Sequence, residues 1–160
     1  MKRNEYIIPL SRDHHFGLLF CWKIRRGLAL KAGLDRICAY VAYFWESHLK
    51  KHFEEEETFL FLPDDPDCRK AISEHQQIAA LVKQLTDPGA TDSNLLTELS
   101  NLLEAHIRYE ERELFPHLEA ILTPAQLADA GAQLATSHTA NNQDVYADEF
   151  WVTSPQTGNV

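Results

Sequence analysis

Two histidine–glutamate pairs recur at the same spacing in this sequence of 160 residues. The first pair is His52 and Glu56, the second is His106 and Glu110, and the sequence around both reads HxxxEExxLF. Residues four apart on a helix lie one turn above each other on the same face, with Cβ atoms about 6 Å apart. An imidazole and a carboxylate at that distance can bind the same metal ion. The repeat therefore predicts a metal site built from two helices.

Both pairs are expected to face the interior of the protein. They continue the apolar phase of their helices, which is set by Val41, Trp45 and Phe59 around the first pair and by Leu99, Leu103 and Leu114 around the second. A charged carboxylate inside a bundle costs several kcal/mol unless it is paired or binds a metal. A single HxxxE segment would be read as chance, with Glu54–Glu57 as a solvated acidic run. Two copies with the same LF ending favour one shared metal cluster.

The chain that carries these pairs is expected to be all-α. Helical periodicity dominates, and breaking residues divide the sequence into long segments, so we expect an antiparallel up-down-up-down four-helix bundle with a short C-terminal extra helix. The expected helices cover about residues 11–31, 35–62, 67–86 and 91–122, and the extra helix begins at Thr123. The bundle domain is expected to span residues 1–150 and to leave 151–160 as a loose tail, with Phe150 and Trp151 as candidates for docking.

A metal site in the core of such a bundle should also draw ligands from the other two helices. The first helix offers the neighbours His14 and His15, and the third offers His75. We expect His15 to face inward, because residues three, four and seven positions later on its face are Leu18, Leu19 and Trp22. The same spacings from His14 reach Gly17, Leu18 and Cys21. A lone histidine on an apolar face, such as His75, is more often a hydrogen-bonded core residue, but its position on the remaining helix makes it a candidate ligand.

Two more histidines leave alternatives open. His48 lies one turn before His52 on the same face. It could be a fifth nitrogen ligand, a partner of Glu56, or a hydrogen-bonded residue of the bundle, and the last of these is the ordinary case. His14, beside His15, is the other residue whose coordination the spacing leaves open.

The order of these residues along the chain, H, HxxxE, H, HxxxE, resembles the hemerythrin-like family, also called the HHE cation-binding domain. The resemblance covers about residues 9–136 and includes Ser11–His15, Glu74 beside His75, and the Leu-Phe-Pro that ends at Pro116. It implies a four-helix bundle around a non-haem di-iron centre. The implied ligands are His15 and His52 for one iron and His75 and His106 for the other, with Glu56 and Glu110 as bridges.

This sequence departs from the oxygen-carrying hemerythrins in two places. They have HxxxH in the third helix, where the residue four positions after His75 is Ala79. They also have an aspartate five residues after the last histidine, where this chain has Glu111 in addition to Glu110. The chain is more similar to the branch with four histidines and two glutamates, which includes repair-of-iron-centres proteins and iron-sensing domains. Fewer histidines leave more open positions on the ions, which favours reaction with oxygen, peroxide or nitric oxide, or exchange of the metal.

The sequence therefore predicts a non-haem di-iron protein that binds or senses oxygen, nitric oxide or iron. The alternative is a di-iron enzyme that acts on peroxide or nitric oxide, or a protein that repairs iron centres. A third interpretation is a bundle that has lost its metal, although every ligand position is filled. Manganese or zinc would suit the same nitrogen and oxygen ligands, and no cofactor beyond the metal is expected. The expected partners are a small diatomic molecule or peroxide, and a sensing role would need an unidentified protein partner.

Charge, hydropathy and cysteine content indicate which partners and which cellular compartment to expect. Acidic residues outnumber basic ones by 24 to 15, for a formal net charge of −9, so nucleic acids and anionic membranes are not expected partners. No apolar run approaches the roughly 20 residues needed to cross a bilayer, and the N-terminus lacks a signal-peptide pattern, so we expect a cytoplasmic protein. The three cysteines, an odd number without CxxC spacing, are expected to be reduced and mostly buried.

Overall fold

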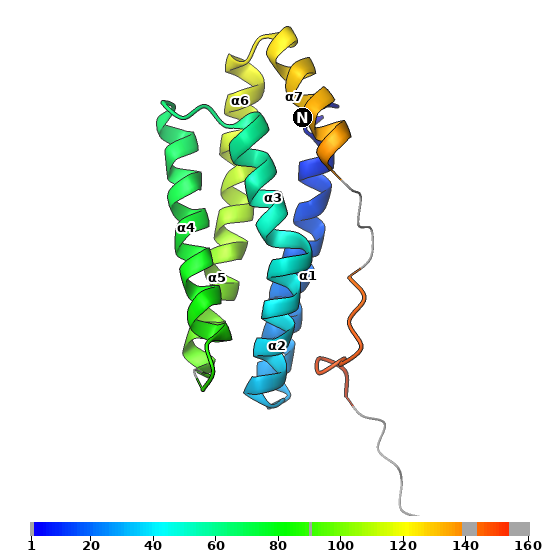
Figure 1. Ribbon diagram of the computed structural model, residues 1–160, viewed down its shortest axis with the longest axis vertical. Coiled ribbons are helices and arrows are strands. Elements are labelled where there is room, and N and C mark those ends of the chain that lie inside the picture. Colours follow the sequence, from blue (N-terminus) through cyan, green and yellow to red (C-terminus); the bar gives the residue numbers. More distant parts are fainter. Residues whose placement is uncertain (1, 90, 139–143, 154–160) are drawn as a thin grey trace, which may run out of the picture.

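The computed structural model describes residues 2–89, 91–138 and 144–153, and within these ranges the chain is helical and forms no strand. Four long helices run side by side in alternating directions, and a shorter helix follows at one end (Figure 1). The first and third long helices are α1 (Ile8–Ala29) and α4 (Pro66–Thr86). The second consists of α2 (Leu34–Phe44), η1 (Trp45–Leu49), α3 (Lys50–Glu55) and η2 (Glu56–Leu60). The fourth consists of α5 (Ser93–Tyr109), η3 (Glu110–Leu114) and α6 (Phe115–Ile121), and α7 (Pro124–Ser137) is the extra helix.

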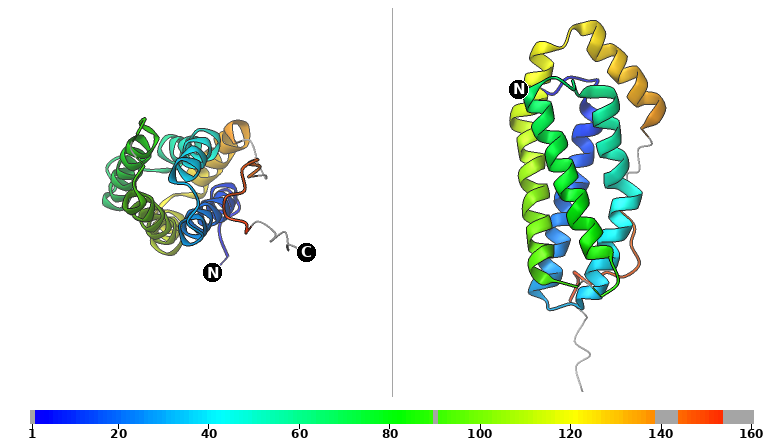
Figure 2. Two further views of the ribbon diagram at one scale, coloured as in Figure 1. Left: turned by 90° about the horizontal axis from the view of Figure 1, so that it is seen from below. Right: turned by 60° about the vertical axis from the view of Figure 1, so that its left-hand side comes forward.

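This arrangement confirms the expected up-down-up-down bundle with a C-terminal extra helix. The view along the bundle axis shows the four long helices around a common centre (Figure 2). None of the described helices is long and apolar enough to cross a membrane.

The helix starts follow local capping chemistry. The side chain of Asp65 accepts hydrogen bonds from the backbone N–H groups of Asp67 and Cys68, which starts α4. Thr123 starts α7 in a capping box with Gln126. The first helix begins before the expected Ser11, at Ile8, because a proline in its first turn needs no backbone donor.

Two apolar clusters fill the bundle, one on each side of a buried polar layer. Along α1, Leu10 belongs to one cluster and Phe20 to the other, and His14 lies between them. Along α5 and η3, Leu103 and Leu114 bracket the polar layer in the same way. The apolar packing therefore holds all four helices in register around the polar layer.

Three turns of the long helices are π-helical, and two of them begin at the glutamates of the sequence repeat. The turn η2 begins at Glu56 and η3 begins at Glu110. The backbone N–H of Phe61 donates to the carbonyl of Glu56 over 2.8 Å, which is the wide i to i+5 bond of such a turn. The HxxxEExxLF repeat is thus also a repeat of backbone geometry. Such π turns occur frequently at functional sites.

The described part of the C-terminal segment packs along α1 and α2 (Figure 2). Phe150 is buried against Gly27, where a Cβ atom would lie 2.6 Å from the phenyl ring. Lys23 and Asp144 form a buried ion pair of 2.7 Å, and Lys23 also lies over the ring of Trp151. Phe150 and Trp151 therefore dock as expected. Most of the expected tail, residues 154–160, lies outside the described residues.

Candidate metal centre

Four histidines and two glutamates meet in the polar layer, and all six are buried. Each long helix supplies at least one of them: His14 from α1, His52 and Glu56 from α3 and η2, His75 from α4, and His106 and Glu110 from α5 and η3. Both glutamates are completely inaccessible to solvent. The spacing of the repeat delivers each pair to the centre, because a histidine and the glutamate four residues later share a helix face.

The ligand atoms form two adjacent groups that share both glutamates. We call the first the His14 position, with His14, His52, Glu56 and Glu110, and the second the His75 position, with His75, His106 and the same glutamates. Within each group, one candidate ligand atom from every residue lies within 4.8 Å of the others. The two groups are therefore suited to two metal ions side by side.

The glutamate oxygens divide between the two positions. Oε1 of Glu56 lies 2.8 Å from Nε2 of His52, and Oε2 lies 3.2 Å from Nε2 of His75. Glu110 also faces both positions: its Oε2 lies 2.9 Å from Nε2 of His14, and its Oε1 lies 3.0 Å from Nε2 of His106. Each carboxylate thus presents one oxygen to each position, which is the arrangement of a bridging ligand.

A second set of carboxylates holds the outer side of the imidazoles. Nδ1 of His14 lies 2.7 Å from Glu111, and Nδ1 of His52 lies 2.9 Å from Asp13. Nδ1 of His75 lies 2.8 Å from Glu57, and Nδ1 of His106 lies 3.5 Å from Glu74. An Nδ1–H that donates to a carboxylate leaves the Nε2 lone pair directed inward, as metal-binding histidines require. Glu111, Asp13 and Glu57 therefore orient the rings of His14, His52 and His75 with Nε2 inward, whereas Nδ1 of His106 is buried near Glu74 without a hydrogen bond.

The inner atoms meet the requirement for a bound cation. Within the described residues, all four oxygens of Glu56 and Glu110 and the Nε2 atoms of His14 and His52 are buried without a hydrogen bond of acceptable geometry. Buried polar atoms are nearly always satisfied in folded proteins, so a cluster of unsatisfied acceptors indicates a ligand that supplies positive charge. The residues present thus fit two metal ions.

The carboxylates of the centre favour the protonated form of its histidines. Burial disfavours charge on His75, but the nearby carboxylates of Glu110, Glu56 and Glu57 raise its pKa to about 11. Burial likewise opposes the charge of Glu110, whereas His106 and His14 hold the pKa of that carboxyl well below its usual range. Metal ions compete with these protons for the same nitrogen atoms.

The expected inward orientation of His15 is wrong. His15 is exposed and His14 is buried, and Trp22, on the face expected to be buried, is 51% exposed. The helix α1 instead packs on α5 through Gly17, where a Cβ atom would lie only 2.7 Å from Cδ1 of Ile107. Small residues on α1 allow this close approach, and helix spacing depends on the side chains at the contact. The buried face of α1 thus carries the small residues Gly17 and Cys21, whereas the large apolar residues Leu18, Leu19 and Trp22 are only partly buried or exposed.

The other five predicted site residues lie together in the centre, and His48 does not belong to either position. The sequence interpretation missed the outer carboxylates. A signal for them exists, because Asp13 and Glu74 directly precede a histidine of the centre, and Glu57 and Glu111 directly follow a central glutamate. The three cysteines are free, buried and outside both positions.

A four-helix bundle with two adjacent carboxylate–histidine positions defines a class of dinuclear metal-binding proteins. Residues 22–118 of this chain match the model of a protein family, the hemerythrin HHE cation binding domain. The match covers more than half of the chain, so the protein belongs to this family. The matched residues include all six of the centre except His14, which lies before them on α1. No curated protein and no solved structure matches the chain.

Proposed function

We propose that this protein holds two iron ions, one at the His14 position and one at the His75 position, and binds or senses a small ligand there. The observation that carries this proposal is the division of the oxygens of Glu56 and Glu110 between the two positions. Two negative bridges offset the repulsion between neighbouring cations. A single structural ion would need neither the shared glutamates nor the second pair of histidines.

The donor atoms favour iron. Each position offers two imidazole nitrogens and two carboxylate oxygens and no thiolate, a set that suits iron better than it suits a closed structural zinc site. Four protein donors leave an octahedral ion with open positions. When bound, iron would supply the capacity to bind oxygen or nitric oxide and to change oxidation state.

The residues of the chain prepare this site in separate ways. Glu111 and Glu57 fix the rings of His14 and His75, and Asp13 fixes that of His52. Phe53 stacks on the ring of His75, with ring centroids 3.8 Å apart, and so covers one face of that ring. A pocket lined by His14, His52 and His106 gives a small molecule access to the centre.

The second candidate function is an enzyme that turns over peroxide or nitric oxide, and the same pocket favours it, because turnover also needs an accessible position. Metal analysis followed by absorption spectroscopy with oxygen, nitric oxide and peroxide tests both candidates. A stoichiometric adduct supports binding or sensing, and many turnovers per chain support the enzyme. A protein that holds fewer than two ions after loading with iron contradicts the proposal.

A further inference from the structure

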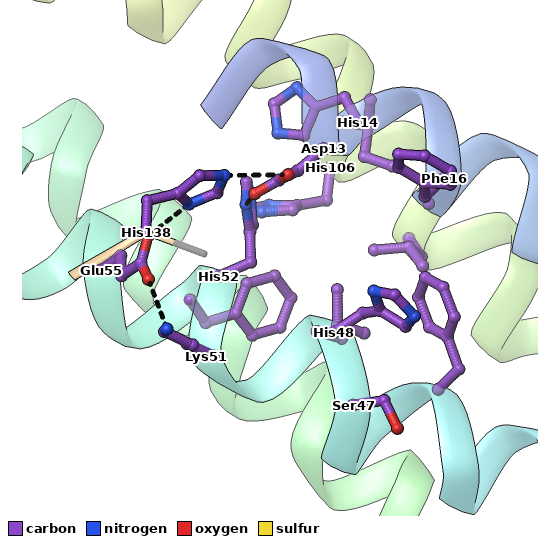
Figure 3. Close-up of a pocket in the computed structure, with 16 residues that line it drawn as sticks. Asp13, His14, Phe16, Ser47, His48, Lys51, His52, Glu55, His106 and His138 are labelled. Atoms are coloured by element: carbon purple, nitrogen blue, oxygen red, sulfur yellow. Dashed lines mark hydrogen bonds and ion pairs between the residues drawn. The ribbon is translucent and has the colours of Figure 1, made fainter. Parts of the chain in front are cut away.

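The pocket beside the metal centre has a volume of about 90 Å³ and includes the rings of His14, His52 and His106 in its wall (Figure 3). The apolar part of the wall is formed by Phe16, Phe44, Leu49, Phe53, Leu103 and Ile107, and the polar part also includes Asp13, Ser47, Lys51, Glu55 and His138. Pockets for drug-sized ligands measure roughly 300–1,000 Å³. The pocket therefore accepts a molecule of only a few non-hydrogen atoms.

His48 places a polar group in the apolar part of this wall. Its ring stacks on Phe44, with centroids 5.0 Å apart, and lies 6.3 Å from the ring of Phe16. Within the described residues, Nε2 of His48 is buried and has no hydrogen-bond partner. A buried nitrogen without a partner destabilises a fold, and a phenyl or leucine side chain would pack here without that cost. Packing alone therefore does not explain a histidine at this position.

Burial favours the uncharged form of this ring. Burial lowers the pKa of His48 below its ordinary value, in spite of the more distant carboxylates of Asp144 and Asp13. A neutral imidazole carries one N–H donor and one acceptor. His48 can therefore donate a hydrogen bond without bringing a further cation close to two metal ions.

We infer that His48 recognises a small ligand in the pocket by donating a hydrogen bond from Nε2 to the end of the ligand that lies away from the metal centre. The inference rests on the proposed function, because the other end of the ligand meets the metal position of His14 and His52. His48 belongs to the π-helical turn η1 and His52 to α3, and their rings line different parts of the pocket (Figure 3). A ligand that meets both the metal position and His48 must therefore have more than one atom.

The chemical class is thus a diatomic or triatomic molecule or anion with a hydrogen-bond acceptor at its far end. Azide and fluoride are suitable probes, because azide has three atoms in a row and fluoride has one. Both would be titrated into the oxidised, iron-loaded wild type, His48→Leu and His48→Gln proteins, with binding followed by visible absorption. The infrared stretching frequency of bound azide reports the hydrogen bond separately from affinity.

We expect His48→Leu to weaken azide binding about tenfold, the effect of one lost hydrogen bond, and to shift the azide frequency. His48→Gln keeps an N–H donor, so it should retain azide affinity within about threefold of wild type. Fluoride should bind equally to all three proteins. Because His48→Leu removes an unpartnered buried nitrogen, its thermal unfolding should not be earlier than that of wild type. If the leucine does not pack, His48→Phe keeps a flat ring and gives the same test.

Iron content, measured first, distinguishes a failure of the proposed function from a failure of the role of His48. A wild-type protein without two irons contradicts the proposed function and this inference with it. Two irons together with equal azide affinity in the wild type and His48→Leu overturn the role of His48 alone. An equal loss of azide and fluoride binding also overturns it, because His48 would then act on the metal centre and not on the far end of the ligand.

Discussion

Oε1 of Glu111 lies 2.7 Å from Nδ1 of His14, on the outer side of a ring whose inner nitrogen faces Glu110. Two consecutive glutamates of one helix therefore act on the two sides of a single histidine of another helix. The other copy of the repeat does the same, since Glu56 and Glu57 lie on the two sides of His75. The site is thus built twice from one pattern, in which the first glutamate faces both metal positions and the second orients a histidine.

The proposed function makes Glu56 and Glu110 bridges between the two ions, so we expect them to be the most sensitive residues of the centre. We expect Glu56→Ala or Glu110→Ala to lower bound iron to one ion per chain or none, because each removes a ligand from both positions. Glu54→Ala is a matched control, since Glu54 belongs to the same acidic run but is exposed. Metal analysis of purified, iron-loaded variants measures the effect. Retention of two ions in Glu56→Ala would show that Glu56 does not bridge.

The neighbours His14 and His15 offer the sharpest comparison within one helix. His14→Ala should lose the ion of the His14 position, because only His52 would remain as a nitrogen ligand there. His15→Ala should keep both ions, because His15 is exposed. Metal analysis of the two variants tests this expectation. Loss of iron from His15→Ala but not from His14→Ala would place His15 in the centre.

The outer carboxylates should tune metal affinity without supplying ligands. We expect Glu57→Gln and Glu111→Gln each to weaken metal binding by about 10–100-fold, the usual effect of losing the partner of a metal-binding histidine. Both variants should still reach two ions per chain at high metal concentration. Competition with a chelator measures the affinity, and Glu113→Gln, exposed in the same segment, serves as a control. Unchanged affinity in both variants would mean that these carboxylates do not orient the rings.

The ion pair of His117 and Asp65 should give a pH-dependent contribution to stability that is independent of the centre. The hydrogen bond of 2.8 Å raises the pKa of His117 and lowers that of Asp65. The contribution of His117 to stability is complete below the ordinary pKa of 6.5 and is lost as the pH rises through the raised pKa. The contribution of Asp65 is complete above the ordinary pKa of 3.8 and is lost as the pH falls through the lowered pKa.

The pair therefore stabilises the fold most between about pH 4 and pH 6.5. We expect His117→Gln to lower the free energy of unfolding by less than about 1 kcal/mol at pH 5.5, because the pair is partly exposed, and by less still at pH 9. Urea denaturation of wild type and variant at both pH values measures the difference. A larger loss at pH 9 than at pH 5.5 would contradict the assignment.

The sequence was sufficient to predict the bundle and most of the centre, because both follow from periodicity. The spacing of four residues in His52 and Glu56, and again in His106 and Glu110, places each pair on one helix face wherever the helix packs. His75 was found by its position on the remaining helix. These inferences needed only the local geometry of a helix.

The orientation of α1 could not be predicted in the same way, because it depends on a contact between helices. His14 faces the centre because Gly17 lets α1 approach Ile107 of α5, and neither residue alone indicates that contact. The outer carboxylates were missed for a related reason. Glu57 belongs to the same helix as Glu56 but meets a histidine of α4, so its role appears only when the helices are assembled.

Anomalous diffraction from crystals of the iron-loaded protein, recorded at the iron absorption edge, would show directly whether two iron ions bind between the four helices. We predict two peaks in the polar layer, about 3.5–4 Å apart as in other two-metal sites, with one oxygen of Glu56 and one of Glu110 beside each peak. A single peak between His14 and His106, or iron bound instead at the surface group of Asp65, Asp67 and His117, would contradict it.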